Sequence, residues 1–138
     1  MLKKVNILIK SAVTTDNDPT PERTEERRGG YVKYTDGGGV SLLSYKAESE
    51  GGVITTELFF EGGAVRIVRR GAIESEMLIE VGKRHSSLYK IPPYAFDMSV
   101  TGNSVRGGIT PDGGELELSY SMSIGGVEKS CLMHITVK

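Results

Sequence analysis

Five side chains in this sequence have the chemistry of a small-molecule site: one arginine, three tyrosines and one glutamate. They are Arg69, Tyr45, Tyr89, Tyr120 and Glu48. A guanidinium binds carboxylates and phosphates through paired hydrogen bonds, and tyrosine joins an apolar ring to a polar hydroxyl. Because these residues are scattered along the chain, their role depends on the elements that position them.

Arg69 lies in the stretch "VRIVRRGAIESEMLIEV", where apolar and charged residues alternate as in two half-buried strands. A two-residue turn between the strands would place Ile67 opposite the charged Glu76, which burial of one face disfavours. A three-residue loop, 71–73, instead places Ile67 opposite Met77. Arg69 shares the face of Ile67, so this register predicts that it points inward.

The same register assigns the remaining charges of this stretch to the outer face. Arg66 and Arg70 then lie near Glu74 and Glu76, as cross-strand pairs exposed to solvent. Val81 falls on the inner face. We therefore interpret these outer charges as an ordinary solvated surface.

An inward arginine needs partners, because burying an unpaired guanidinium is costly. The simpler interpretation is a structural arginine that plugs one barrel end by bonding backbone carbonyls or an acid such as Glu48. The alternative is an arginine that recognises an anion at the mouth of a cavity. The inward tyrosines likewise fill a core more often than they contact a ligand.

The elements around these residues are predicted to be β-strands. Eighteen glycines occur mostly as neighbours, and doubled glycines between apolar runs indicate tight turns. In "ELELSYSMSI" and "VEKSCLMHITV" apolar and polar residues alternate on either side of Gly125–Gly126, as in a hairpin. No stretch shows an apolar stripe at helical spacing.

The strand pattern predicts an all-β fold with little or no helix: a closed antiparallel meander barrel of about 8–10 strands. We expect Thr15–Pro21 to be a mobile loop, and Pro92–Pro93 to produce a kink or crossover. The candidate strands are 3–14, 23–35, 40–48, 53–60, 64–70, 73–81, 84–91, 94–101, 104–110, 115–124 and 127–137.

Length and composition fit one domain spanning 1–138, with a 38% hydrophobic and 25% charged chain. A net charge of -1 gives no reason to expect nucleic acid or a membrane surface as partner. The single cysteine, Cys131, needs no oxidising compartment. The opening "MLKKVNILIK" alternates, unlike a signal peptide. We expect a soluble cytoplasmic protein.

Catalytic and metal-binding patterns are weak. The residues His85, His134 and Cys131 lack the spacing of a zinc site, and opposite parity sends His134 and Cys131 to opposite faces. The chain has no nucleophile elbow, phosphate loop or HExxH motif. We therefore expect no metal and no cofactor, and an enzyme ranks third among the hypotheses.

The chain resembles the YwiB-like family, bacterial proteins of unknown function with small calycin-like, lipocalin-like barrels. The resemblance covers nearly the whole chain and is carried by "GGYVKY", "LLSYKAE", "RRGAIESEM", "LYKIPPYAF" and "LELSYSM". The family's arginine feature matches Arg69 and Gly71. Its tyrosines and acid match Tyr31, Tyr45, Tyr89, Tyr120 and Glu48. Where many members have a Thr-Pro-aromatic-Gly turn, this chain has Ile91-Pro92-Pro93-Tyr94.

The resemblance implies a closed barrel and no particular activity. Related barrels bind small apolar ligands, and they often place an arginine across one end as a structural latch. Our first hypothesis is a non-enzymatic barrel that binds a small, partly apolar anion through Arg69, Tyr45, Glu48, Tyr89 and Tyr120. The alternative is a solid-cored structural or interaction module, such as a homodimer formed through a strand edge.

Overall fold

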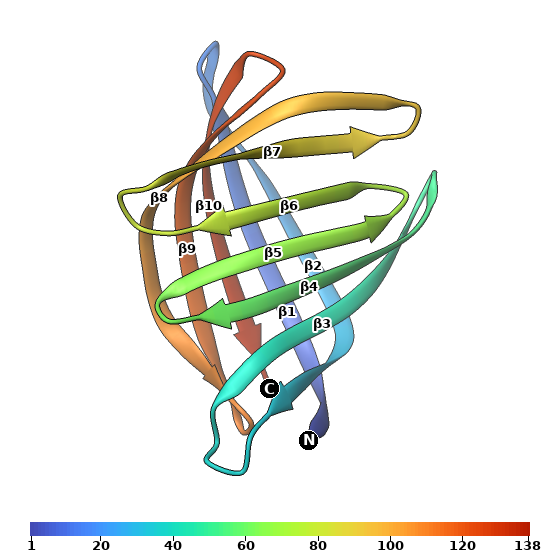
Figure 1. Ribbon diagram of the computed structural model, residues 1–138, viewed down its shortest axis with the longest axis vertical. Helices are drawn as coiled ribbons and strands as arrows, with labels where there is room; N and C mark the ends of the chain where they lie inside the picture. Colours follow the sequence, from blue (N-terminus) through green and yellow to red (C-terminus); the bar gives the residue numbers. More distant parts are fainter.

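The computed structural model describes residues 1–138 and contains ten β-strands and no helix. Each strand pairs antiparallel with its sequence neighbours, and β1 pairs with β10, so the sheet closes into a barrel (Figure 1). The strands are β1 Leu2–Thr15, β2 Asp18–Tyr34, β3 Val40–Ser49, β4 Gly52–Glu61, β5 Ala64–Gly71, β6 Glu74–Ile79, β7 Arg84–Ile91, β8 Tyr94–Thr110, β9 Gly113–Ile124 and β10 Val127–Val137. This confirms the predicted all-β barrel. The structure has no helix long and apolar enough to cross a membrane.

The core lies inside the barrel, because alternate residues of each strand point inward. On β9 and β10 the predicted parity is confirmed: Leu118, Tyr120, Cys131, Met133 and Ile135 are all buried. The largest fully buried side chains are Leu43, Leu58, Ile67, Ile79, Leu118, Ile135, Val32, Val65, Val100 and Val137. Burial of this continuous apolar interior stabilises the barrel.

Glycine pairs form tight turns where the sequence places them. In Gly62–Gly63 the φ angles are 56° and 92°, and in Gly125–Gly126 they are 56° and 85°. Two successive positive φ values fit the type I′ turns that join twisted antiparallel strands in two residues. These turns set the registers of β4 with β5 and of β9 with β10.

Three local expectations need correction. The expected loop Thr15–Pro21 is a tight hairpin, in which Thr15 pairs with Asp18 and β2 begins at that residue. Segments 94–101 and 104–110 form one strand, β8, because a register shift at Gly102 to Ser104 absorbs the irregularity without breaking the ladder. Pro92 and Pro93 occupy the β7–β8 hairpin turn rather than a crossover, so they need no ladder donor.

The barrel wall is uneven around its circumference. Strand β9 pairs with β10 over eleven residue pairs, whereas β6 pairs with β7 over two, Glu74 with Lys90 and Ser75 with Tyr89. Strands β4 to β7 cross steeply over β1, β9 and β10, which lie behind them (Figure 1). We call the part of the sheet formed by β8, β9, β10 and β1 the continuous wall. We call the β6–β7 junction, together with the flanking strand β5, the seam.

Strand β2 also has an unpaired edge. It pairs with β1 along nearly its whole length but with β3 only from Gly30 onward. Residues Asp18 to Gly29 therefore have no neighbour on one side. This stretch contains Pro19 and Pro21, followed by a mixture of acidic and basic residues.

Candidate functional site

Five inward residues on adjacent strands form a row that we call the polar belt: Tyr45, Thr56, Arg69, Ser75 and Tyr89. Each lies directly opposite the next, from β3 through β4, β5 and β6 to β7. Directly opposed residues of antiparallel strands share a face. The neighbours of Arg69 are buried, with Thr56 at 3% and Ser75 at 7% exposure, so the belt faces the barrel interior.

The predicted register that brings Arg69 inward is confirmed. Ile67 lies opposite Met77, and Arg69 lies opposite Ser75. One expectation from the same stretch is wrong: Val81 is 54% exposed, because β6 ends at Ile79 and the chain then leaves the inner face.

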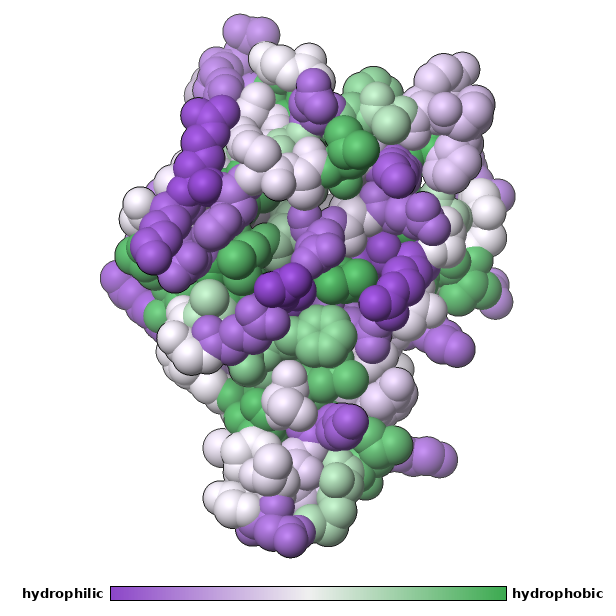
Figure 2. All heavy atoms as spheres, viewed as in Figure 1, coloured by the Kyte–Doolittle hydropathy of each residue, from purple (hydrophilic) through white to green (hydrophobic).

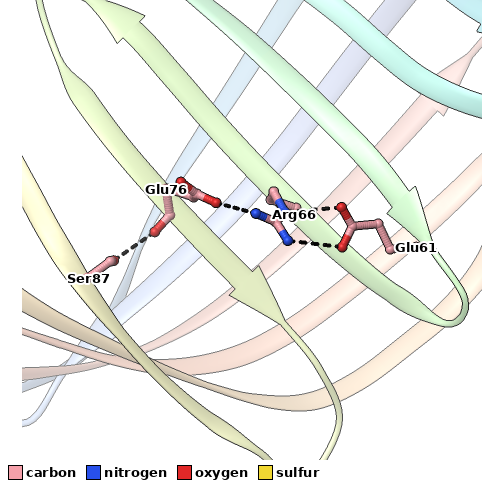
Figure 3. A network of polar contacts seen from close by, with 4 residues as sticks. All are labelled: Glu61, Arg66, Glu76 and Ser87. Atoms are coloured by element: carbon pink, nitrogen blue, oxygen red, sulfur yellow. Dashed lines mark hydrogen bonds and ion pairs between the residues drawn. The ribbon is translucent and has the colours of Figure 1, made fainter.

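The outer charges of this stretch are saturated by partners within the chain. Arg66 donates from Nε and Nη2 to Glu61 at 3.1 and 3.2 Å and also pairs with Glu76 across β5 and β6 (Figure 3). Arg70 pairs with Glu57 on β4, not with Glu74 as its register position suggested. These pairs leave Arg66 and Arg70 no role as free cations.

Arg69 differs from Arg66 and Arg70. It is half-buried and makes no ion pair and no side-chain hydrogen bond within the chain. The structural plug that the sequence favoured would require bonds to backbone carbonyls or to an acid, and the structure has none. Glu48 does not supply the acid, because it is exposed on β3 and its parity is opposite to that of inward Tyr45.

Ser75, beside Arg69 in the belt, has an unsatisfied hydroxyl. Its Oγ is buried and lacks any hydrogen-bond partner. Buried hydroxyls nearly always find a partner, since leaving one unpaired is costly. An unpaired guanidinium and an unpaired hydroxyl therefore lie side by side on the inner face.

The interior contains a pocket of about 310 Å³ next to the belt. Ten of its fourteen lining residues are hydrophobic, including Tyr89 and Tyr120, and Arg69 is one of the four others. Four other hollows are larger, at about 490, 350, 520 and 420 Å³, but each has only one or two hydrophobic lining residues. The interior pocket alone among these combines apolar enclosure with polar anchors, as small-molecule sites do.

The pocket gathers nearly all the sulfur atoms of the chain. Four of the five methionines, Met77, Met98, Met122 and Met133, line it together with Cys131. We call these five residues the sulfur-rich lining. Methionine side chains are flexible and polarisable, so such a lining adapts its shape to an apolar body.

The charge of the pocket is one-sided. Its lining contains two cations, Arg69 from β5 and Lys129 from β10, and no aspartate or glutamate. Lys129 is also half-buried and has no ion pair. The arrangement attracts an anion into an otherwise apolar space.

Buried hydroxyl and thiol groups respond to these surroundings. Burial raises the pKa of Tyr45, and the positive charge of Arg69 opposes that rise. Burial also raises the pKa of Tyr120, and the facing Cys131 adds to the rise. Burial raises the pKa of the Cys131 thiol, while Tyr120 and the charge of Lys129 lower it. Both tyrosines and the thiol are therefore neutral near pH 7, and they offer the pocket no negative charge.

Sequence reasoning found part of this arrangement. Arg69, Tyr89 and Tyr120 line one pocket, Tyr45 lies in the belt outside the pocket lining, and Glu48 faces solvent. Ser75 and Lys129 were missed. Lys129 shares the inward parity of Cys131, and that signal could have found it; the unpaired state of Ser75 has no sequence signal.

No group of three or more histidine, cysteine or acidic side chains is placed to hold a metal ion. His85 contacts Glu80 at 3.0 Å, with Nε2 next to Oε1. His134 lies 3.9 Å from Glu115 on the outer face, away from buried Cys131. The two histidines are thus engaged separately at the surface.

The fold and the site define a class: a closed antiparallel barrel with an apolar interior pocket and an inward arginine. The chain belongs to the family described as a domain of unknown function, DUF1934, whose model matches residues 7–135. Its structure is similar to the crystal structure of the ywiB protein from Bacillus subtilis, with a TM-score of 0.84 and 20% sequence identity over 99% of this chain and 93% of that one. The resemblance to the YwiB-like family is confirmed. No curated protein matches the chain.

Proposed function

We propose that this protein is a non-enzymatic barrel that binds a small, partly apolar anion in its interior pocket. Arg69 holds the anionic group, and the sulfur-rich lining contacts the apolar part. Tyr89 and Tyr120 border the site with their rings. The volume of about 310 Å³ lies at the lower end of the range for small-molecule pockets.

One observation carries the proposal: Arg69 lines an acid-free apolar pocket on the inner face and has no partner within the chain, although it also borders an outer hollow with Glu74 and Glu76. A guanidinium in such a place is costly unless something neutralises it. A bound anion supplies two acceptor oxygens in the geometry that the guanidinium fork matches. Ser75, whose buried hydroxyl also lacks a partner, lies opposite Arg69 in the polar belt.

The alternative, a solid-cored structural or interaction module, predicts an interior filled by side chains. The pocket argues against it, and so does the unsatisfied Ser75 hydroxyl. We also propose a bacterial, cytoplasmic setting. It is supported by the similarity to a Bacillus subtilis protein and by a lone buried cysteine that needs no oxidising compartment.

Native mass spectrometry of the purified protein, with and without denaturation, tests the proposal. We expect a co-purified anion that is released on unfolding. In the Arg69→Met variant we expect the bound anion to be lost while the free energy of unfolding is unchanged or higher, because an unpaired buried charge is removed.

A structural latch predicts the opposite result for Arg69→Met, a loss of about 3–5 kcal/mol, as for breaking a buried ion pair. Such a loss, together with no bound anion in the wild type, would overturn the binding function. The matched control is Arg70→Met on the outer face, which removes a neighbouring arginine without touching the pocket.

A further inference from the structure

Lys129 is the second cation of the pocket, and it lies on a different wall from Arg69. It stands on β10 opposite Met122 of β9, with Thr15 of β1 on its other side. It lines the pocket although lysines of strand tips usually extend into solvent. None of the ion pairs in the structure includes it, whereas Lys83 pairs with Glu80.

The two cations flank a pair of buried groups. Tyr120 of β9 and Cys131 of β10 lie opposite each other, and both line the pocket. The charge of Arg69 acts on Tyr120, and the charge of Lys129 acts on Cys131. Arg69 on β5 and Lys129 on β10 also lie five strands apart around the ten-strand barrel, so they approach the pocket from opposite walls.

From this placement we propose that the ligand is an organic dianion: two anionic groups separated by an apolar spacer, one held by Arg69 and the other by Lys129. The inference rests on the proposed function and names its ligand class. Lys129 thereby becomes the residue that distinguishes a dianion from a monoanion.

The walls explain why each anionic group needs its own cation. Of 92 backbone hydrogen bonds, 82 lie within the strands, so most backbone N–H groups of the barrel are already engaged. The backbone therefore forms no anion-binding nest of the kind found at helix N-termini or glycine-rich loops. Side chains must hold the ligand, and the pocket offers two cationic ones and no acid to compete with it.

The spacer must be apolar because the part of the pocket between Arg69 and Lys129 is apolar. Met122, Met133 and Ile124 lie in that lining, and its facing polar pair, Tyr120 and Cys131, is neutral near pH 7. A sugar-like spacer would leave hydroxyls unpaired against these side chains, which costs binding free energy.

Isothermal titration calorimetry with matched model compounds tests the dianion proposal: octanedioate, octanoate and octanol share one apolar chain and differ in anionic groups. Wild-type protein, cleared of any bound molecule by refolding, should bind octanedioate roughly ten- to hundredfold more tightly than octanoate, the range of one charge-assisted hydrogen bond. Octanol should bind most weakly.

Variants separate the two anchors. Lys129→Gln should remove the preference for octanedioate over octanoate while octanoate binding stays, and Lys129→Arg should restore the preference. Arg69→Met should weaken both acids. Lys46→Gln, which removes an exposed lysine from the outer face of β3, is the control and should change neither.

The outcomes distinguish the two levels of the proposal. Equal binding of octanoate and octanedioate, with no effect of Lys129→Gln, overturns the dianion while Arg69-dependent binding keeps the proposed function. Absence of binding by all three compounds, with Arg69→Met unchanged from wild type, overturns both.

Discussion

The continuous wall and the seam use the same kind of strand for different ends. In the continuous wall, β9 and β10 share eleven residue pairs, and their inward side chains are apolar apart from Tyr120 and Lys129. At the seam, β6 and β7 share two pairs, and the inward side chains at that level are Arg69, Ser75 and Tyr89. The seam thus supplies Arg69, while the continuous wall supplies Lys129 and most of the apolar lining of the pocket.

The reason for the division is physical. A long ladder pairs every backbone group and leaves the inner face free to bury apolar side chains, which is the main source of stability. A short ladder contributes less to the stability of the fold. Burying polar groups there therefore lowers the free energy of unfolding less than it would in the middle of a tightly packed wall. The space-filling view shows hydrophilic and hydrophobic residues intermixed over the outer face of strands β3 to β7 (Figure 2). No single polar patch on this face marks the position of the polar groups inside.

The strongest way to break the continuous wall is Leu118→Ala on β9. Leu118 is fully buried, and removing its side chain leaves a cavity between strands held by long ladders. We expect a loss of about 2–5 kcal/mol in the free energy of unfolding by urea denaturation. Leu132→Ala on β10 is the control, since Leu132 is 44% exposed and lies outside the buried core. A loss below that of the control would contradict the division.

Alkaline pH should act next, through the continuous wall. Burial raises the pKa of Tyr120 above the ordinary value of 10.0. Above about pH 10 the unfolded state loses the phenol proton and the folded state keeps it, so stability falls as pH rises. The expected slope is about 1.4 kcal/mol per pH unit for this group.

Urea denaturation at a series of pH values measures this slope in wild type and in Tyr120→Phe. The variant should lose part of the slope, since Tyr45 shares the same behaviour and remains. Identical slopes in the two proteins would show that Tyr120 ionises as readily in the folded state as in the unfolded one.

A smaller effect is expected at the seam from Ser87→Ala. The Ser87 hydroxyl donates to the Glu76 carbonyl at 2.7 Å, a side-chain bond between β7 and β6 where the ladder has stopped (Figure 3). Its removal should cost about 0.5–1.5 kcal/mol and speed amide exchange in β6 and β7 more than in β9 and β10.

The matched control is Ser86→Ala, one residue away and exposed, with no such bond. Hydrogen exchange followed by mass spectrometry reports both strands at once. Uniform acceleration over all ten strands would show that the seam is not a separate unit of local opening.

The smallest change is expected from Arg66→Gln on the outer face of the seam. Arg66 bonds Glu61 and Glu76, but its surroundings are exposed and screened by solvent. We expect a smaller shift in the urea midpoint than for Ser87→Ala, and we expect added salt to reduce the difference between Arg66→Gln and wild type. A larger shift would mean that the pairs hold β4, β5 and β6 together.

Local pattern was enough to predict most of the fold. The alternation of apolar and polar residues and the glycine pairs predicted the strands. Placing Ile67 opposite Met77 predicted the register in which Arg69 points inward. The prolines misled, because Pro92 and Pro93 fit a hairpin turn as well as a break. The continuity of β8 depends on a register shift, which the sequence does not mark.

The site was less predictable because it depends on what the closed barrel brings together. Parity placed Arg69, Tyr89 and Tyr120 inside, but not their meeting around one pocket. Glu48 lies on the face of β3 opposite to that of inward Tyr45, so it is not near Arg69. The missing partner of Ser75 depends on which side chains the closed barrel places around its hydroxyl, a tertiary feature.

The uncovered edge of β2, from Asp18 to Gly29, bears on how the protein behaves when concentrated. An open strand edge is a template on which another chain can add, and long chains of such additions form fibrils. Here Pro19 and Pro21 offer no N–H to an incoming strand, and the charges that follow disfavour dry stacking of identical chains. The part of β2 that has no pairing strand on one side thus also carries the residues that disfavour aggregation.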